Sequence, residues 1–117
     1  MINTIRICEI EDEIRKIETD SDEAEECANM SLNDVEEIYE ATQNCLRMYS
    51  SEFEACQDDP YLTNLVEERY NLMLKACREC DDFITELETE KKYMKQTCRT
   101  NIEALEQEKH MLEVMPQ

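Results

Sequence analysis

The residues of this chain that offer the most chemistry are its cysteines and its single histidine. Cys77 and Cys80 form a Cys-x-x-Cys pair, a spacing found in zinc sites and redox-active dithiols. A zinc site needs about two further ligands nearby, and a thioredoxin-like dithiol needs a βαβ unit. The sequence offers neither. We therefore interpret both cysteines as packing residues, and we expect no metal and no cofactor.

His110 and Cys8 are the second pair with catalytic residue types. An antiparallel hairpin centred near residue 59 would bring residue i opposite residue 118 − i, which sets His110 level with Cys8. A Cys–His pair can act as nucleophile and base, but no third member or oxyanion donor accompanies this one. Phosphate-binding loops need glycine, and the chain has none. We expect no catalytic residues and no enzymatic activity.

The charge of the chain narrows the choice of partner. Thirty acidic residues against twelve basic ones give a net charge of −18. Such a surface repels nucleic-acid phosphates and anionic membranes. We expect no nucleic-acid binding and no membrane insertion, and a protein partner with a basic or apolar surface. The alternative is that the acidity serves solubility alone.

Cysteine usage and the first residues indicate a compartment. Seven cysteines, an odd and scattered set, fit a complete disulfide framework poorly. The start of the chain turns acidic at Glu9, before a hydrophobic run long enough for a signal peptide can build up. We expect reduced thiols and a cytoplasmic protein. Export without a cleavable signal remains the alternative.

The elements that carry these residues are predicted to be helices throughout. Hairpin turns of β-sheets rely on glycine, whereas apolar residues here recur at spacings of three and four. The segment Asp58-Asp59-Pro60 interrupts this pattern with 57 residues on either side. The sequence predicts an all-α fold, an elongated antiparallel helical hairpin of coiled-coil type. Residues 1–117 form one domain, with arms 2–57 and 61–115 around a turn at 58–60.

Each arm has a stripe of residues predicted to pack in the seam between the arms. In the second arm Lys91 is the main gap in the stripe, and in the first arm the polar residues 19–22 and a capping signal at Ser31 allow a kink or a break near 19–31. A three-helix arrangement is the rival layout. The first-arm stripe comprises Ile7, Ile10, Ile14, Ile17, Val35, Ile38, Cys45, Tyr49, Phe53 and Cys56. The second-arm stripe comprises Leu62, Val66, Tyr70, Met73, Cys77, Cys80, Ile84, Leu87, Met94, Cys98, Ile102, Leu105, Leu112 and Met115.

The chain has more apolar residues than one seam can bury. Consecutive apolar residues point in different directions around a helix, so some of them must face away from the seam. Exposed apolar stripes usually await another helix. We expect a non-enzymatic adaptor or chaperone, with a self-associating scaffold or an acidic inhibitor of a basic enzyme as alternatives. The candidate partner-binding residues are Leu46, Met48, Leu72, Leu74, Phe83, Met111 and Val114.

Three segments of the second arm resemble a known group of small helical proteins. They are residues 65–69 (Leu-Val-Glu-Glu-Arg), 83–87 (Phe-Ile-Thr-Glu-Leu) and 88–92 (Glu-Thr-Glu-Lys-Lys). This pattern resembles the helper proteins associated with LXG toxins of the type VII secretion system, which are helical hairpins similar to WXG100 proteins. The resemblance covers roughly residues 32–112.

The resemblance implies a partner and a role. It implies a targeting chaperone that binds the helical N-terminal domain of a secreted toxin together with a second small helical protein. The Trp-x-Gly turn of WXG100 proteins is missing here, because the chain has neither residue, and no Tyr-x-x-x-Asp/Glu export signal is present. Within that family, this chain would supply a binding surface rather than the secretion signal.

Overall fold

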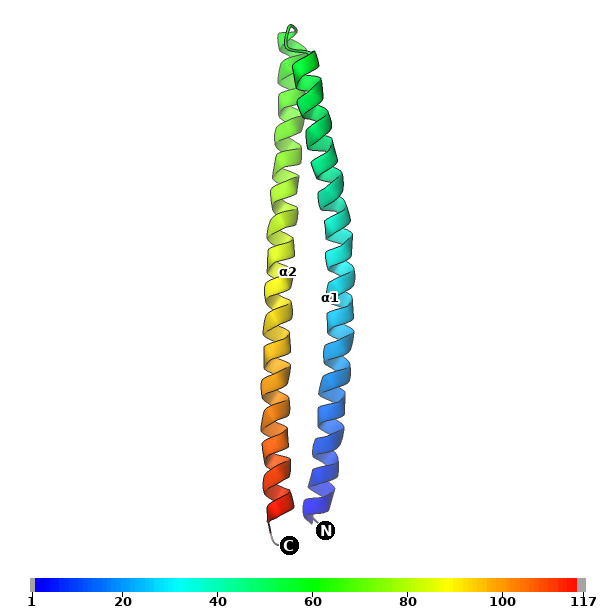
Figure 1. Ribbon diagram of the computed structural model, residues 1–117, viewed down its shortest axis with the longest axis vertical. Helices are drawn as coiled ribbons and strands as arrows, with labels where there is room; N and C mark the ends of the chain where they lie inside the picture. The colour runs from blue at the N-terminus through cyan, green and yellow to red at the C-terminus, as the bar shows by residue number, and fades with distance from the viewer. Residues whose placement is uncertain (1, 116–117) are drawn as a thin grey trace. The chain divides into compact units, whose positions relative to one another are not determined.

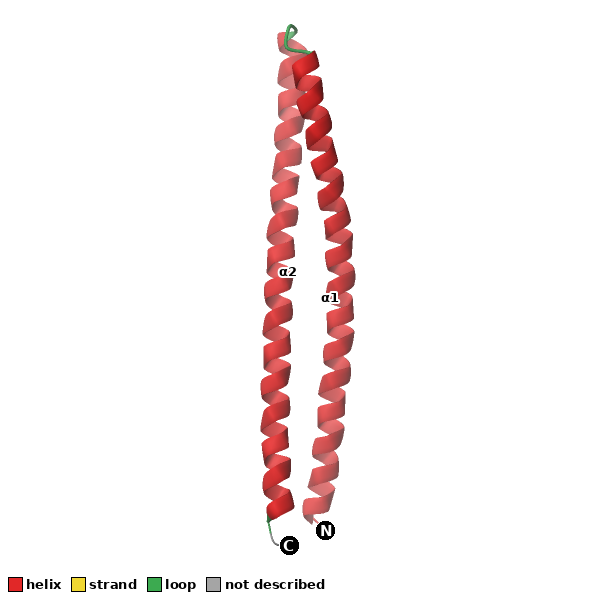
Figure 2. Cartoon of the chain, viewed as in Figure 1, coloured by secondary structure: helices red, strands yellow, loops and turns green. Residues whose placement is uncertain are grey.

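The computed structural model describes residues 2–115, and these form two helices and no strand. Helix α1 spans Ile2–Ala55 and helix α2 spans Pro60–Val114, as Figure 1 and Figure 2 show. The predicted all-α helical hairpin is confirmed. The contacts divide the chain into unit 1, residues 1–29 with 89–117, and unit 2, residues 30–88. In each unit a segment of α1 lies antiparallel beside a segment of α2.

The turn between the helices forms without glycine, because no described residue has a positive φ. Asp59 caps α2: its Oδ1 accepts hydrogen bonds from the backbone N–H groups of Tyr61 at 3.0 Å and Leu62 at 3.2 Å. Pro60 takes the first helical position, where its missing N–H costs nothing. The Thr63 hydroxyl donates to the Cys56 carbonyl at 2.8 Å, which ties the end of α1 to the first turn of α2.

Helix α1 is continuous through both places where a break was considered, so the three-helix alternative is wrong. Thr19, Asp20 and Asp22 are exposed, and their side chains reach solvent without interrupting the helix. Ser31 is an exposed residue inside α1 and caps nothing. The backbone bonds of the helix and the packing of its apolar stripe outweigh the weak local preference of these polar residues.

The seam of unit 2 is narrow, and its position on α1 differs from the prediction. Ile38 was expected in the seam but is 54% exposed, whereas Tyr39 is half-buried. The cause is a local change of spacing: two successive steps of four residues shift the buried stripe around the helix axis. The stripe on α1 runs through Ala24, Ala28, Leu32, Val35, Tyr39, Thr42, Leu46 and Tyr49.

Pairings across the seam give the register within each unit. In unit 2, Gln43 Nε2 donates to Cys77 Sγ at 3.3 Å. In unit 1, Lys109 pairs with Glu11 at 3.2 Å. In both pairs the two residue numbers sum to 120, whereas the predicted hairpin requires a sum of 118. The predicted register is therefore correct to within about half a helical turn.

Lys91, the gap in the apolar stripe of α2, belongs to a polar layer of unit 1. Its Nζ donates to Asn29 Oδ1 at 2.7 Å and lies 3.9 Å from Glu25, which also pairs with Lys95 at 3.0 Å. The hydrogen bond from Lys95, together with the charges of both lysines, lowers the pKa of Glu25. A polar layer in a helical seam favours one register over others, because a slipped register would leave its groups unpaired.

A cluster around Arg6 holds the two helices together near the ends of unit 1. Arg6 Nε and Nη2 donate to the two carboxylate oxygens of Glu108 at 2.9 and 3.0 Å, and Nη1 donates to Glu13 at 3.1 Å. This two-pronged pairing raises the pKa of Arg6 and lowers that of Glu108. Ile10, between these partners in sequence, is fully buried.

Candidate protein-docking face

A second apolar stripe runs along α1 in unit 2, beside the one that packs in the seam. Ile38, Ala41, Cys45 and Met48 follow each other at spacings of three, four and three residues. Ile38 is 54% and Met48 50% exposed; Ala41 is exposed and Cys45 half-buried. This is the spacing of a coiled-coil seam, on a flank that α2 leaves uncovered.

Helix α2 carries a matching stripe. Its apolar residues fall on two interleaved heptad series. Leu62, Ala76 and Phe83 belong to the series that starts at residue 62, and Leu65 and Leu72 belong to the series that starts at residue 65. Leu72 is 64% exposed, and Phe83 and Leu62 are also exposed. Arg69 and Glu79 occupy the remaining positions of these series. The flank is therefore apolar with two charged interruptions.

The two stripes lie on the same side of unit 2. Ser50 and Glu54 of α1 line one groove together with Glu67 and Asn71 of α2, so these four residues mark one side. At 100° per residue, Met48 lies on the flank of α1 opposite to Ser50 and Glu54. By the same rule, Leu65 lies on the flank of α2 opposite to Glu67. The other residues of each stripe lie on the same flank as Met48 or Leu65, because they are spaced by three or four residues along the helix. We name the resulting surface the docking face, and it comprises Ile38, Ala41, Cys45, Met48, Leu62, Leu65, Leu72, Ala76 and Phe83.

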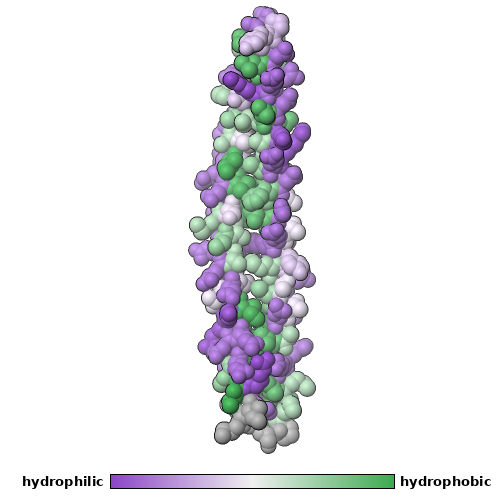
Figure 3. Space-filling view, turned by 180° about the vertical axis from the view of Figure 1, so that it is seen from behind, coloured by the Kyte–Doolittle hydropathy of each residue, from purple (hydrophilic) through white to green (hydrophobic). Residues whose placement is uncertain are grey.

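Figure 3, which views the molecule from behind relative to Figure 1, shows hydrophobic residues gathered in patches along the two helices. The charges of unit 2 are one-sided: residues 30–88 hold 15 acidic and 4 basic residues, a net charge of 4 − 15 = −11. All ion pairs found among residues 2–115 lie in unit 1. Unit 2 thus combines an exposed apolar face with acidic residues that no cation of the described chain neutralises at ion-pair distance.

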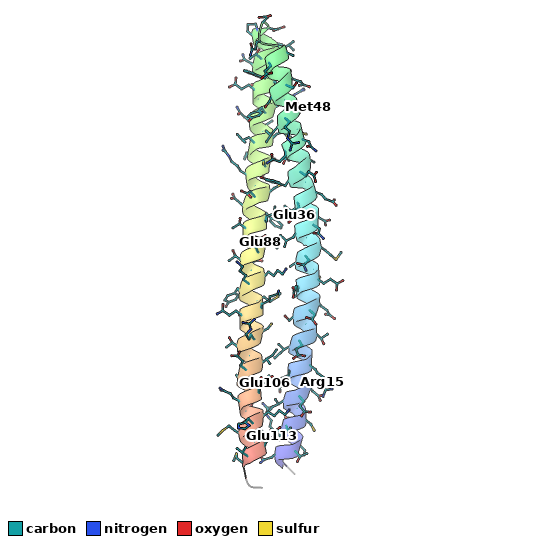
Figure 4. All side chains as sticks on the ribbon, viewed as in Figure 1. Arg15, Glu36, Met48, Glu88, Glu106 and Glu113 are labelled. Carbon is teal, nitrogen blue, oxygen red and sulfur yellow. The ribbon has the colours of Figure 1, made fainter. Side chains whose placement is uncertain are left out.

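The seven candidate partner-binding residues do not form one surface. Met48, Leu72 and Phe83 share the docking face, and Figure 4 labels Met48 on α1. Leu46 is half-buried in the seam, and Leu74 is half-buried on the opposite side of α2. The remaining two, Met111 and Val114, are exposed in unit 1. Six residues of the face were missed, namely Ile38, Ala41, Cys45, Leu62, Leu65 and Ala76, and three of these, Ile38, Cys45 and Leu62, had been assigned to the seam. The 3-4 spacing of Ile38 with Ala41 and Cys45 was readable from the sequence.

The two pairs with catalytic or metal-binding spacing, Cys77 with Cys80 and Cys8 with His110, stay apart from this face. Cys77 is buried in the seam and Cys80 is half-buried beside it, while Cys8 and His110 are both exposed in unit 1. Residues 2–115 contain no cluster of three or more histidine, cysteine or acidic side chains arranged to hold a metal ion. Neither α1 nor α2, over the part described, has the length of apolar sequence that a bilayer crossing requires.

The burial of the cysteines predicts an order of thiol reactivity. Cys77 is 8% exposed and accepts a hydrogen bond from Gln43, whereas Cys8 and Cys27 are exposed. A thiol reagent should modify Cys77 at least about tenfold more slowly than the exposed pair in the native protein. Mass spectrometry of a labelling time course measures this. All seven should react in denaturant without reductant; fewer than seven would reveal a disulfide, and equal native rates would contradict the seam position of Cys77.

Comparison with known proteins adds no relative to these observations. No protein-family model, no curated protein and no solved structure matches the chain. The docking face of unit 2 and the seam chemistry of the two helices are therefore the observations on which a function must rest.

Proposed function

We propose that the chain is a non-enzymatic docking protein that binds a helix of another protein on the docking face of unit 2. The supporting observation is the pair of 3-4 stripes on one side of two adjacent helices, whose residues are exposed except for the half-buried Cys45, Leu65 and Ala76. A third helix with its own 3-4 apolar stripe can lie along the groove between them and complete a three-helix bundle. The stripe on α2 spans residues 62–83, which corresponds to about 32 Å, or three heptads, of partner helix.

Charge selects the kind of helix. Glu79 lies within the stripe of α2, Glu52 and Glu86 continue the stripes of α1 and α2 at their ends, and Glu37 and Glu68 border them by the same helical geometry. A partner helix with lysine or arginine on its flanks would pair with these carboxylates, as charged flanking positions do in coiled coils. A second copy of this chain would instead bring two units of net charge −11 together. We infer that the occupant is a basic amphipathic helix from a different protein.

A narrower form of this proposal rests on the resemblance of residues 65–69 and 83–92 to helpers of LXG toxins. In that form the occupant is the helical N-terminal domain of such a toxin, and the chain delivers it to a type VII secretion system. Co-expression with an LXG toxin encoded beside this chain tests the narrower form. A soluble complex supports it, whereas no complex with a neighbouring toxin would remove it and leave the general proposal standing.

The general proposal is tested with the full chain and two designed peptides. Both are about three heptads long and share a leucine stripe, but one has lysine and the other glutamate on its flanks. We expect the lysine peptide to bind at least about tenfold more tightly, with an affinity that falls as salt is added. Isothermal titration measures both. Equal binding of the two peptides, or no binding of either, would contradict the proposal.

Sedimentation of the chain alone is the accompanying measurement. A lone chain that stays monomeric at low salt supports a foreign occupant. A stable homodimer at low salt would show that a second copy covers the docking face, and the scaffold alternative would replace the proposal.

A further inference from the structure

A groove of about 400 Å3 opens on the side of unit 2 opposite to the docking face. Its floor consists of Tyr49 and Phe53 from α1 and of Val66 and Tyr70 from α2, each pair one helical turn apart. Glu54 and Glu67 are the charged groups of its lining, one from each helix. The groove therefore combines an aromatic floor with two carboxylates from opposite helices.

The chain itself leaves this groove unfilled. Phe53 occupies a position in phase with the seam, since it follows Tyr49 by four residues, yet it is 38% exposed. Nothing basic lines the groove, and no ion pair found among residues 2–115 involves Glu54 or Glu67. An open aromatic surface beside two unpaired carboxylates is complementary to a flat organic cation.

We propose that this groove binds the guanidinium group of an arginine side chain carried by a protein partner. A guanidinium is planar, so it can stack on the faces of tyrosine and phenylalanine rings and direct its N–H groups at carboxylates at the same time. An ammonium group is more strongly hydrated and makes no planar stack. This inference does not rest on the proposed function, because the groove and the docking face share no residue.

The probe for this site is Nα-acetyl-arginine amide, which carries the side chain without a free carboxylate. Nuclear magnetic resonance of the full chain should show saturable shifts of the ring protons of Tyr49 and Tyr70. The uncharged analogue Nα-acetyl-citrulline amide should give no saturable shifts, and Nα-acetyl-lysine amide should bind at least about threefold more weakly than the arginine probe. Equal binding of citrulline and arginine would overturn the proposal.

Two double variants with the same loss of charge separate the site from general acidity. Glu54→Gln with Glu67→Gln should weaken the arginine probe at least about fivefold. Glu36→Gln with Glu88→Gln, on α1 and α2 of the same unit and labelled in Figure 4, should leave its affinity within about twofold. All four side chains are exposed, so circular dichroism should show both variants folded. Equal losses in the two variants, or no ring shifts in the unmodified chain, would overturn the proposal.

Discussion

Replacing Leu72 and Phe83 together with glutamate should weaken binding of the lysine-flanked peptide at least about 100-fold, while the free protein stays folded. Both side chains lie on the docking face, and Leu72 is 64% exposed in the free chain. A bound helix would bury them, and a carboxylate buried without a partner costs several kcal/mol. Titration calorimetry measures the affinity, and circular dichroism measures helix content and the thermal midpoint.

The sign of this effect distinguishes docking from simple charge attraction. The double variant adds two negative charges, so a peptide held only by its lysines would bind more tightly. Weaker binding therefore requires that the apolar stripes make contact. Tighter or unchanged binding would show that the peptide recognises the acidity of the chain and not the docking face.

Two further variants complete the experiment. Tyr93→Glu makes the same kind of change at a 72% exposed residue of α2 in unit 1, and it should leave binding within about threefold. Ile84→Glu places a carboxylate at a half-buried seam position and should unfold or strongly destabilise the free protein. If Leu72→Glu and Phe83→Glu instead unfolded the chain as Ile84→Glu does, both residues would belong to its own core, and the docking face would not exist.

The fold could be predicted because a few residues determine it strongly. The absence of glycine and the 3-4 spacing of apolar residues exclude most β architectures. Asp59 and Pro60 give a cap and a first helical residue, so the reversal could occur at one place only. The reversal and the length of the arms then set the register, and the pairing of Gln43 with Cys77 agrees with it.

The side on which each apolar residue lies was harder to predict. An extra four-residue step between Ala28 and Leu32 shifts the stripe of α1, and this moved Ile38 out of the seam and Tyr39 into it. After such a step, the spacing alone does not show which of two neighbouring residues, such as Ile38 or Tyr39, lies in the seam. Leu74 illustrates a second difficulty. The sequence spacing shows that Leu72 and Leu74 point in different directions around α2, but it does not show which of the two lies on the docking face.

The electrostatic partners of the polar seam residues could not be predicted from spacing. Lys91 interrupts the apolar stripe, and its contact with Asn29 depends on the side-chain lengths and the exact height of one helix against the other. A long lysine reaches several residues across a seam. The sequence therefore showed that Lys91 interrupts the apolar stripe. The polar layer that Lys91 forms with residues of α1 could be recognised only from the structure of both helices.

Replacing Ile10 with alanine should destabilise unit 1 by about 2–4 kcal/mol, the usual cost of removing a buried isoleucine. Ile10 is the one fully buried large side chain among residues 3–115. The ion pairs of Arg6 with Glu108 and of Glu11 with Lys109 flank it in sequence and hold α2 against this part of α1. A cavity at this point removes apolar contacts that a seam of half-buried residues cannot replace, because a two-helix interface has no further layer to collapse into the space.

Ile5→Ala is the matched control, since it removes the same atoms from a side chain that is 61% exposed, and it should change stability by less than about 0.5 kcal/mol. Urea denaturation followed by circular dichroism gives the two midpoints, and hydrogen exchange locates the loss along the chain. For Ile10→Ala, exchange should accelerate most at residues 6–14 and 105–112, while unit 2 keeps its protection. Equal midpoints for the two variants would mean that the ion pairs, and not the apolar contact they surround, hold the helices of unit 1 together.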